Sequence, residues 1–231
     1  MMDVKEDYTI LLDREGSSWL RICHLPEELA TYGAVHFDEM FTLHPQDRAK
    51  VIMPCGEVAC HRWQQSYLNT PVWNPERRSS YMFSGINPDP QPELPPLFRR
   101  YLDYMNHGQK RYNQMVVNWY QGGSDYIAQH ADYEHGAVPG SDVAIITFNR
   151  DDSIPRTFCI KAKGTTLDSV EKQVEIELIH GRIVIMGGAT QSKFRHGVPK
   201  KQQAAPRISI TLRHFQVNSH HHSLGTYLTV A

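Results

Sequence analysis

The chain has almost no excess of charge of either sign. Lys and Arg contribute 24 positive charges and Asp and Glu contribute 25 negative charges over 231 residues. A protein that attracts nucleic acid through its overall field carries a large basic excess. Any contact with a polyanion therefore needs a local basic patch, and the charge balance neither favours nor excludes a nucleic-acid partner.

Long apolar runs and paired cysteines are also scarce. No window approaches the ~20 apolar residues of a membrane span, and residues 1–7 contain no apolar stretch after a basic start. We therefore expect neither a membrane anchor nor an export signal. The cysteines show no disulfide framework, and none forms the second pair that a zinc site needs: Cys23, Cys55, Cys60 and Cys159. We expect reduced thiols in an intracellular protein, in the nucleus or the cytoplasm.

The amino-terminal part reads as a partly helical extension over residues 1–45. It begins with the strand-like segment Tyr8–Leu12 and continues into a helix that starts near Pro26, because proline followed by acidic residues is typical of a helix start. Five apolar residues are expected to form the buried stripe of this helical layer: Leu29, Val35, Phe37, Met40 and Phe41.

Residues 46–216 read as one β-rich domain of the α+β class. Residues 49–86 contain short β-prone pieces and loops, 87–96 is a proline-rich connector, and apolar spacing predicts a helix over 97–105. Short apolar segments separated by turn residues then predict a β-sandwich or jelly roll, namely 115–120, 143–148, 157–161, 174–179, 182–186 and 208–212. The alternation in Val174–Leu178 predicts one buried face and one wet face. Residues 217–231 read as a flexible tail.

The strongest chemical signal is an H-x-D pair followed by a distant histidine. His130 and Asp132 stand at the end of a strand-like segment, and His196 precedes the last strand. Two imidazoles and one carboxylate on neighbouring strands could hold Fe(II) on one face and leave positions open for a co-substrate and oxygen. The H-x-D pair alone is a weak signal, and the order of the three elements strengthens it.

Several motifs occur together in the order found in one enzyme family: Tyr81–Gly85, Asn118–Tyr120, His130–Asp132 with Glu134, Ser141–Phe148, His196–Gly197 and Arg207–Arg213. From about residue 50 to 215 the chain resembles the DNA-repair branch of the AlkB-family Fe(II)/2-oxoglutarate dioxygenases. The resemblance implies a double-stranded β-helix (jelly-roll) core with flanking helices and a substrate-recognition loop region.

The resemblance also implies a role for each matching residue. His130, Asp132 and His196 would be the iron ligands, with no catalytic side chain needed beyond the metal centre. Five residues would bind 2-oxoglutarate, namely Asn118, Tyr120, Arg207, Ser209 and Arg213. The arginines would pair with its carboxylates, and Ser209 stands where the family commonly has Asn.

Substrate recognition would involve a second group of residues. Tyr81 and Phe83 resemble the family's substrate-loop aromatics, which hydrogen-bond to or stack on a base turned out of its helix. Trp73 is a second candidate stacking wall or a loop anchor. Glu134 stands where the family often has Asp, and its longer side chain predicts a different base preference.

Basic pairs along the chain would supply local positive charge around the mouth of the site: His61-Arg62, Arg77-Arg78, Arg99-Arg100, Lys110-Arg111 and Lys200-Lys201. Residues 53–56 fall where related repair enzymes carry a hairpin that probes the duplex. The segment has no large aromatic residue at its tip, which argues against a wedge.

The function that this resemblance implies is oxidative demethylation of N-alkylated bases. Decarboxylation of 2-oxoglutarate, with Fe(II) and O₂, would be coupled to hydroxylation of a methyl group and release of formaldehyde. The expected partner is alkylated nucleic acid, with DNA favoured and RNA possible, and the protein is expected to be a monomer. Two alternatives stay open, namely a 2-oxoglutarate-dependent hydroxylase of a protein or small molecule, and a non-catalytic jelly-roll binding module.

Overall fold

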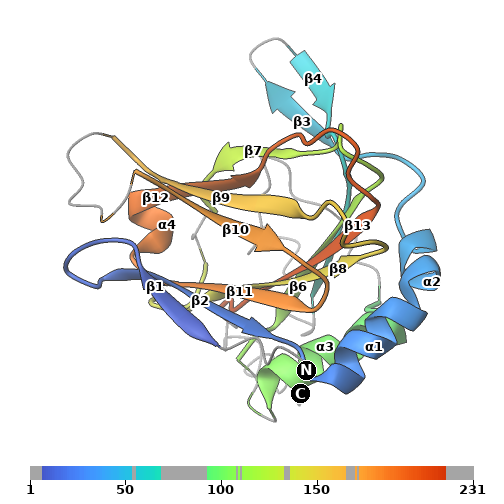
Figure 1. The fold of residues 1–231 in the computed structure, drawn as a ribbon, viewed down its shortest axis with the longest axis horizontal. Coiled ribbons are helices and arrows are strands. Elements are labelled where there is room, and N and C mark those ends of the chain that lie inside the picture. The colour runs from blue at the N-terminus through green and yellow to red at the C-terminus, as the bar shows by residue number, and fades with distance from the viewer. Residues whose placement is uncertain are drawn as a thin grey trace, which may run out of the picture.

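Two antiparallel sheets packed face to face form the body of the molecule (Figure 1). The computed structural model describes residues 7–53, 56–68, 93–107, 109, 111–132, 136–164, 170 and 172–216. Within those residues, no helix is long and apolar enough to cross a lipid bilayer.

The larger sheet has seven strands, and each is antiparallel to its neighbours. In order across the sheet the strands are β1 (Tyr8–Leu11), β2 (Ser18–His24), β11 (Arg182–Gly188), β8 (Val143–Asn149), β13 (Arg207–Arg213), β6 (Gln114–Tyr120) and β5 (Trp63–Leu68). Strands β6, β8 and β13 at its centre are buried along their whole length. Such strands need cover on both faces of the sheet.

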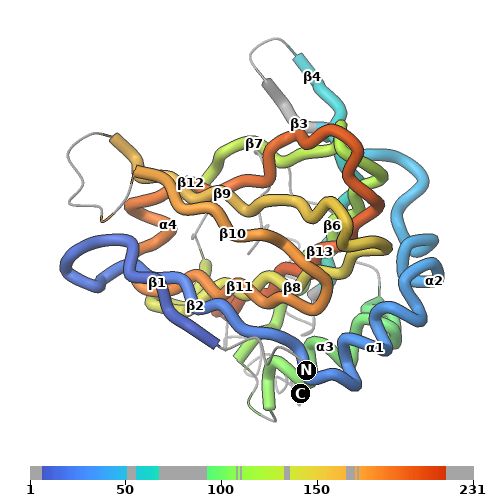
Figure 2. Tube along the Cα trace, in the orientation of Figure 1, coloured from blue at the N-terminus to red at the C-terminus, as the bar shows by residue number. Residues whose placement is uncertain are grey.

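The smaller sheet covers one of these faces. Its four strands are, in order, β10 (Gln173–Leu178), β9 (Arg156–Ala162), β12 (Phe194–Val198) and β7 (Ile127–His130). From β6 to β13 the chain crosses repeatedly between the two sheets, as its path shows (Figure 2). This alternation is the connectivity of a double-stranded β-helix, and it confirms the predicted jelly-roll core.

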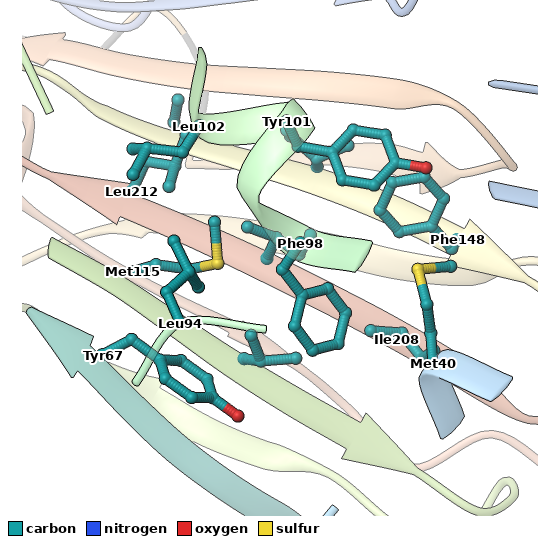
Figure 3. Close-up of a cluster of buried hydrophobic side chains, with 14 of the residues drawn as sticks. Met40, Tyr67, Leu94, Phe98, Tyr101, Leu102, Met115, Phe148, Ile208 and Leu212 are labelled. Carbon is teal, nitrogen blue, oxygen red and sulfur yellow. The ribbon is translucent and has the colours of Figure 1, made fainter. Parts of the chain in front are cut away.

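Helices cover the outer face of the larger sheet. They are α1 (Glu27–Val35), α2 (Phe37–Thr42) and α3 (Pro96–Asn106). Their apolar side chains pack on those of the sheet, and Figure 3 shows Phe98 of α3 and Met40 of α2 beside Ile208 of β13. Tyr101 lies against Phe148, with ring centroids 4.7 Å apart.

One glycine is required for the close approach of α1 to the sheet. A Cβ atom built on Gly33 would lie 2.5 Å from Cδ1 of Phe148. A larger residue would force the helix away from β8, although most residues favour a helix more than glycine does.

A second apolar cluster fills part of the space between the two sheets. Leu20, Ile22 and Val184 of the larger sheet meet Phe158, Ile160 and Leu178 of the smaller sheet. The two faces of a strand carry alternate residues. In β13, Ile208, Ile210 and Leu212 therefore enter the helical core, and the polar residues between them face the smaller sheet.

Two further elements lie outside the two sheets. Strands β3 (Lys50–Met53) and β4 (Gly56–Ala59) form a separate antiparallel hairpin that projects from the body (Figure 1). A short helix, α4 (Thr190–Lys193), connects β11 to β12.

The predicted elements are largely confirmed. Helix 97–105 is α3, the six predicted strands are β6, β8, β9, β10, β11 and β13, and the alternating burial of β10 is as expected. Sequence reasoning missed β2, β12 and α4. It was also wrong about Val35, which was expected to be buried and is 73% exposed. Residues 1–45 are therefore more than a helical cover, because β2 pairs with β11 in the larger sheet. The tail 217–231 and most of the connector 87–96 lie outside the described residues.

Asp13 holds the turn between β1 and β2, and its loss is expected to destabilise the fold. It is 2% exposed and accepts hydrogen bonds from the Ser17 amide (2.8 Å), the Ser17 hydroxyl (2.8 Å) and Lys193 Nζ (3.2 Å). We expect Asp13→Ala to lower the free energy of unfolding by about 2–4 kcal/mol, because buried donors to a charged acceptor lose their partner. Glu15→Ala, at the exposed end of the same turn, should change the melting temperature little.

The effect of Asp13→Ala should depend on pH. Burial alone would raise the pKa of Asp13, but hydrogen bonds from Ser17, Ser18 and Lys193 together outweigh burial and hold the pKa below its ordinary value of 3.8. The stabilisation is therefore fully present above that ordinary value and is lost as the pH falls below it. Thermal unfolding should show a wild-type advantage at neutral pH that narrows below pH ~4. A difference that stays constant through this range would contradict the role of the ionised carboxylate.

Candidate metal centre

The three predicted ligands converge on one point of the smaller sheet. His130 ends β7, and antiparallel pairing places it directly opposite His196 of β12. Asp132 follows just beyond the end of β7. The candidate ligand atoms of the three side chains all lie within 4.8 Å of one another, and the two imidazole centroids are 4.4 Å apart. The strand register therefore unites residues that are far apart in the sequence.

An irregularity in the pairing shapes this point. The register between β12 and β7 shifts between His196 and Val198. At Gly197 a Cβ atom would lie 2.8 Å from the carbonyl oxygen of Ile127. Bulges of this kind redirect side chains near functional sites, and glycine is the residue that permits so close an approach.

Charge in the cluster favours an ionised carboxylate. Asp132 Oδ2 accepts hydrogen bonds from Arg213 Nε (3.0 Å) and Nη2 (2.7 Å), and Oδ1 lies 3.4 Å from His130 Nε2. Burial opposes ionisation, but the charge of Arg213 and the contact with His130 outweigh it and hold the pKa of Asp132 below its usual range. Asp132 is therefore an anionic ligand at neutral pH.

The two histidines offer ring nitrogens to a metal ion. Burial lowers the pKa of His196 to about 3, with Asp132 opposing the shift, so its imidazole is neutral. His130 Nδ1 lies 2.9 Å from the carbonyl oxygen of Ala128. A hydrogen bond donated there leaves the lone pair on Nε2, which faces Asp132. Two imidazoles and one carboxylate form a donor set that fits Fe(II).

A second group of polar residues lies on the inner face of the larger sheet. In the register of β13 and β6, Arg207 stands opposite Tyr120, and Ser209 stands opposite Asn118. These residues alternate with the apolar ones that enter the helical core, so all four face the smaller sheet.

Arg207 has the properties of a binding residue for an anion. Its side chain is 1% exposed, and its Nη2 atom donates to Thr147 Oγ1 at 3.2 Å. Within the described part of the chain, Nε and Nη1 have no hydrogen-bond partner. Burial lowers the pKa of Arg207 to about 10, which leaves the guanidinium charged at neutral pH. A buried cation with two unused donors fits a carboxylate, which it can bind through two parallel hydrogen bonds.

Arg213 makes a contact that the sequence did not predict. The sequence comparison implied that both arginines bind carboxylates of 2-oxoglutarate, but Arg213 directs two of its donors to Asp132. Its role toward the co-substrate stays a prediction. The observed hydrogen bonds from Arg213 hold the carboxylate of Asp132 in place.

Two buried arginines near these residues make contacts that the sequence did not predict. Arg62 was expected to supply positive charge around the mouth of the site, but it is 4% exposed and donates through Nε to Asn118 Oδ1 at 2.7 Å. Arg156 is 1% exposed and donates to three main-chain carbonyl oxygens, those of Gly122, Asp125 and Pro199. No local sequence signal distinguishes a buried arginine that binds carbonyl groups from an exposed one, because its partners come from distant loops.

The prediction that basic residues surround the mouth of the site is only partly supported. Arg99 and Arg100 are exposed on α3, which covers the opposite face of the larger sheet from the candidate metal centre, so they do not surround its mouth. Lys200 is exposed and lies 4.9 Å from the centre of the Tyr126 ring. The predicted substrate residues lie outside the described part of the chain, namely Trp73, Tyr81, Phe83 and Glu134, as do Arg77, Arg78 and Lys110.

Comparisons with known proteins agree with this geometry. A model of the 2OG-Fe(II) oxygenase superfamily matches residues 37–213. The chain is 31% identical over 140 residues to the DNA oxidative demethylase ALKBH2 of Homo sapiens, which covers 58% of this chain and 51% of the relative. It is 29% identical over 139 residues to the alpha-ketoglutarate-dependent dioxygenase alkB homolog 3 of Mus musculus, covering 58% and 47%. The matched segment thus spans about half the length of these curated relatives.

A solved structure supports the fold. An oxidoreductase of the 2OG-Fe(II) oxygenase family from Burkholderia pseudomallei superposes with a TM-score of 0.51 over 89% of each chain. Its sequence identity to this chain is 14%, so the likeness concerns the fold alone.

Proposed function

Because the chain belongs to the 2OG-Fe(II) oxygenase superfamily, we propose that it oxidatively demethylates N-alkylated bases in nucleic acid, with DNA as the favoured substrate. The proposal rests on the occurrence of a candidate metal site and a candidate carboxylate-binding residue in the same protein. The His130, Asp132 and His196 cluster offers a donor set for Fe(II), and the buried Arg207 offers unused donors for a carboxylate. An enzyme that uses iron and a keto acid requires both a metal site and a site for a carboxylate.

The choice of substrate class rests on the relatives. One is named as a DNA oxidative demethylase and another as an alkB homolog, at 29–31% identity. The β3–β4 hairpin projects from the body of the molecule, as expected of a surface that contacts a large substrate. An ion pair between Lys50 and Glu57 joins its two strands. The hairpin is exposed along all of β4.

Each group of residues in the candidate site has a proposed role in the reaction. With Fe(II), 2-oxoglutarate and O₂ bound, the cofactor would supply the oxidising power for hydroxylation of an N-methyl group, which then leaves as formaldehyde. His130, Asp132 and His196 would hold the metal on one face. Arg207 would bind one carboxylate of the keto acid, with Tyr120 and Asn118 on the neighbouring strand beside it. Arg213 would keep the Asp132 carboxylate in place.

Measurement of succinate tests the proposal. We expect purified protein with Fe(II) and 2-oxoglutarate to form succinate faster when oligonucleotides containing 1-methyladenine or 3-methylcytosine are added, and unmethylated oligonucleotides of the same sequence serve as the control. Stimulation by peptides or small metabolites alone would indicate a hydroxylase of another substrate. No succinate under any condition would indicate a non-catalytic jelly roll.

A further inference from the structure

Gln191 connects the two segments that carry the candidate metal ligands. It lies on α4, directly before the strand that bears His196, and its side-chain Oε1 accepts a hydrogen bond from the backbone N–H of Asp132 at 3.0 Å. The residue is 7% exposed. We infer that Gln191 is a positioning residue for Asp132, an inference that rests on the metal site of the proposed function.

The backbone of Asp132 needs such a partner because its strand has ended. Strand β7 stops at His130, where its pairing with β12 also stops. A buried backbone N–H without an acceptor is destabilising, and the side chain of Gln191 supplies the acceptor that the strand pairing no longer provides. The side-chain amide of Gln191 points the other way, to Met186 Sδ at 3.8 Å.

Helix α4 is itself firmly held, so Gln191 is presented from a fixed base. The carbonyl oxygen of Gln191 accepts from Lys163 Nζ at 2.7 Å. The hydroxyl of Thr190 donates to the carbonyl oxygen of Gly187 at 2.6 Å and accepts from the Trp19 amide at 3.2 Å. These contacts tie one turn of helix to β2, to β11 and to the residue that follows β9.

The turn between β1 and β2 holds the end of α4. Lys193 Nζ donates to Ser17 Oγ (2.8 Å) and Asp13 Oδ2 (3.2 Å), and the Ala189 amide donates to the Ser17 carbonyl oxygen (2.8 Å). Figure 1 shows α4 between this turn and β12. The turn precedes residue 37, where the match to the family model begins. A segment outside the family match thus supports the segment that orients Asp132.

Asp132 is consequently restrained at two separate places. Gln191 holds its backbone, and Arg213 holds its carboxylate through two hydrogen bonds. Loss of an outer-shell partner of a metal ligand typically weakens metal affinity by ~10–100-fold. We therefore assign the affinity of the site for a divalent metal partly to Gln191.

Metal binding by the anaerobic apoprotein tests this inference. Titration with Co(II), followed by visible absorption, should show that Gln191→Met weakens binding by ~10–100-fold. Gln191→Glu retains an acceptor oxygen at the same distance from the backbone and should recover most of the affinity. Gln173→Met makes the same exchange at an exposed hydrogen bond on β10 and should bind Co(II) like the wild type. Wild-type affinity in a folded Gln191→Met protein would overturn the inference.

Amide hydrogen exchange gives a second readout that needs neither metal nor turnover. The Asp132 amide of the wild-type apoprotein should exchange slowly, and in Gln191→Asn, whose side chain is one methylene shorter, it should exchange faster while amides of β8 are unchanged. Exchange of the wild-type Asp132 amide at the rate of a free peptide would overturn the inference even if no variant folds. Absence of Co(II) binding by the wild type would instead contradict the proposed function.

Discussion

Asp132→Ala is expected to abolish turnover and to weaken metal binding by more than the ~100-fold that loss of an outer-shell partner can cost. The variant removes the only anionic ligand of the candidate set, and two neutral imidazoles hold a divalent cation poorly without a carboxylate. Succinate formation and Co(II) titration measure the two effects separately.

The structure adds a stability cost to this variant that the sequence did not predict. Arg213, whose side chain is 9% exposed, would lose the carboxylate that accepts two of its hydrogen bonds. Breaking a buried ion pair by removing one partner costs up to about 3–5 kcal/mol. Asp132→Asn keeps a neutral acceptor for Arg213, so it should unfold closer to the wild-type temperature while turnover is still lost. Undiminished turnover in Asp132→Ala would remove Asp132 from the ligand set.

Arg207→Met is expected to weaken 2-oxoglutarate binding by ~30-fold to several thousand-fold, corresponding to the loss of 2–5 kcal/mol on truncation of one partner of a buried charge pair. The physical reason is that Nε and Nη1 of Arg207 would supply two charged hydrogen bonds to one carboxylate. Calorimetric titration of 2-oxoglutarate into the anaerobic Co(II)-loaded protein measures the change.

Arg207→Met weakens binding of 2-oxoglutarate but should not destabilise the apoprotein. Arg207 is a buried cation, and no carboxylate within the described residues hydrogen-bonds to it. Replacing it with an apolar side chain of similar length removes a desolvation cost, so the apoprotein should be as stable as the wild type or more stable. Arg21→Met, at an exposed pair on β2, is the matched control for both measurements. Unchanged affinity for 2-oxoglutarate in Arg207→Met would place the co-substrate elsewhere.

Much of the fold could be predicted because its cause is local. Alternation of apolar and polar residues specifies which face of β10 is buried, and a six-residue separation within one strand places Arg207 and Arg213 on the same face. The H-x-D pair and the distant histidine could be identified as ligands by residue type and order. Their convergence depends on the register of β12 against β7, which no local pattern specifies.

The parts that could not be predicted depend on contacts between distant segments. The pairing of Arg213 with Asp132, the burial of Arg62 against Asn118 and the hydrogen bond from Asp132 to Gln191 each join residues from different strands or loops. Strand β2 was missed because its seven residues include polar side chains at both ends, and its place in the sheet depends on pairing with β11.

Mass spectrometry of defined oligonucleotides tests the central claim most directly. Oligonucleotides that carry one 1-methyladenine, 3-methylcytosine or N6-methyladenine, each as DNA and as RNA, are incubated with the protein, Fe(II), 2-oxoglutarate and air, and Asp132→Ala serves as the blank. We predict that at least one methylated oligonucleotide loses the mass of one methylene group and that formaldehyde appears in equal amount, with no change in the blank. Succinate formation that leaves every methylated oligonucleotide unchanged would contradict the proposal that this iron site demethylates nucleic acid.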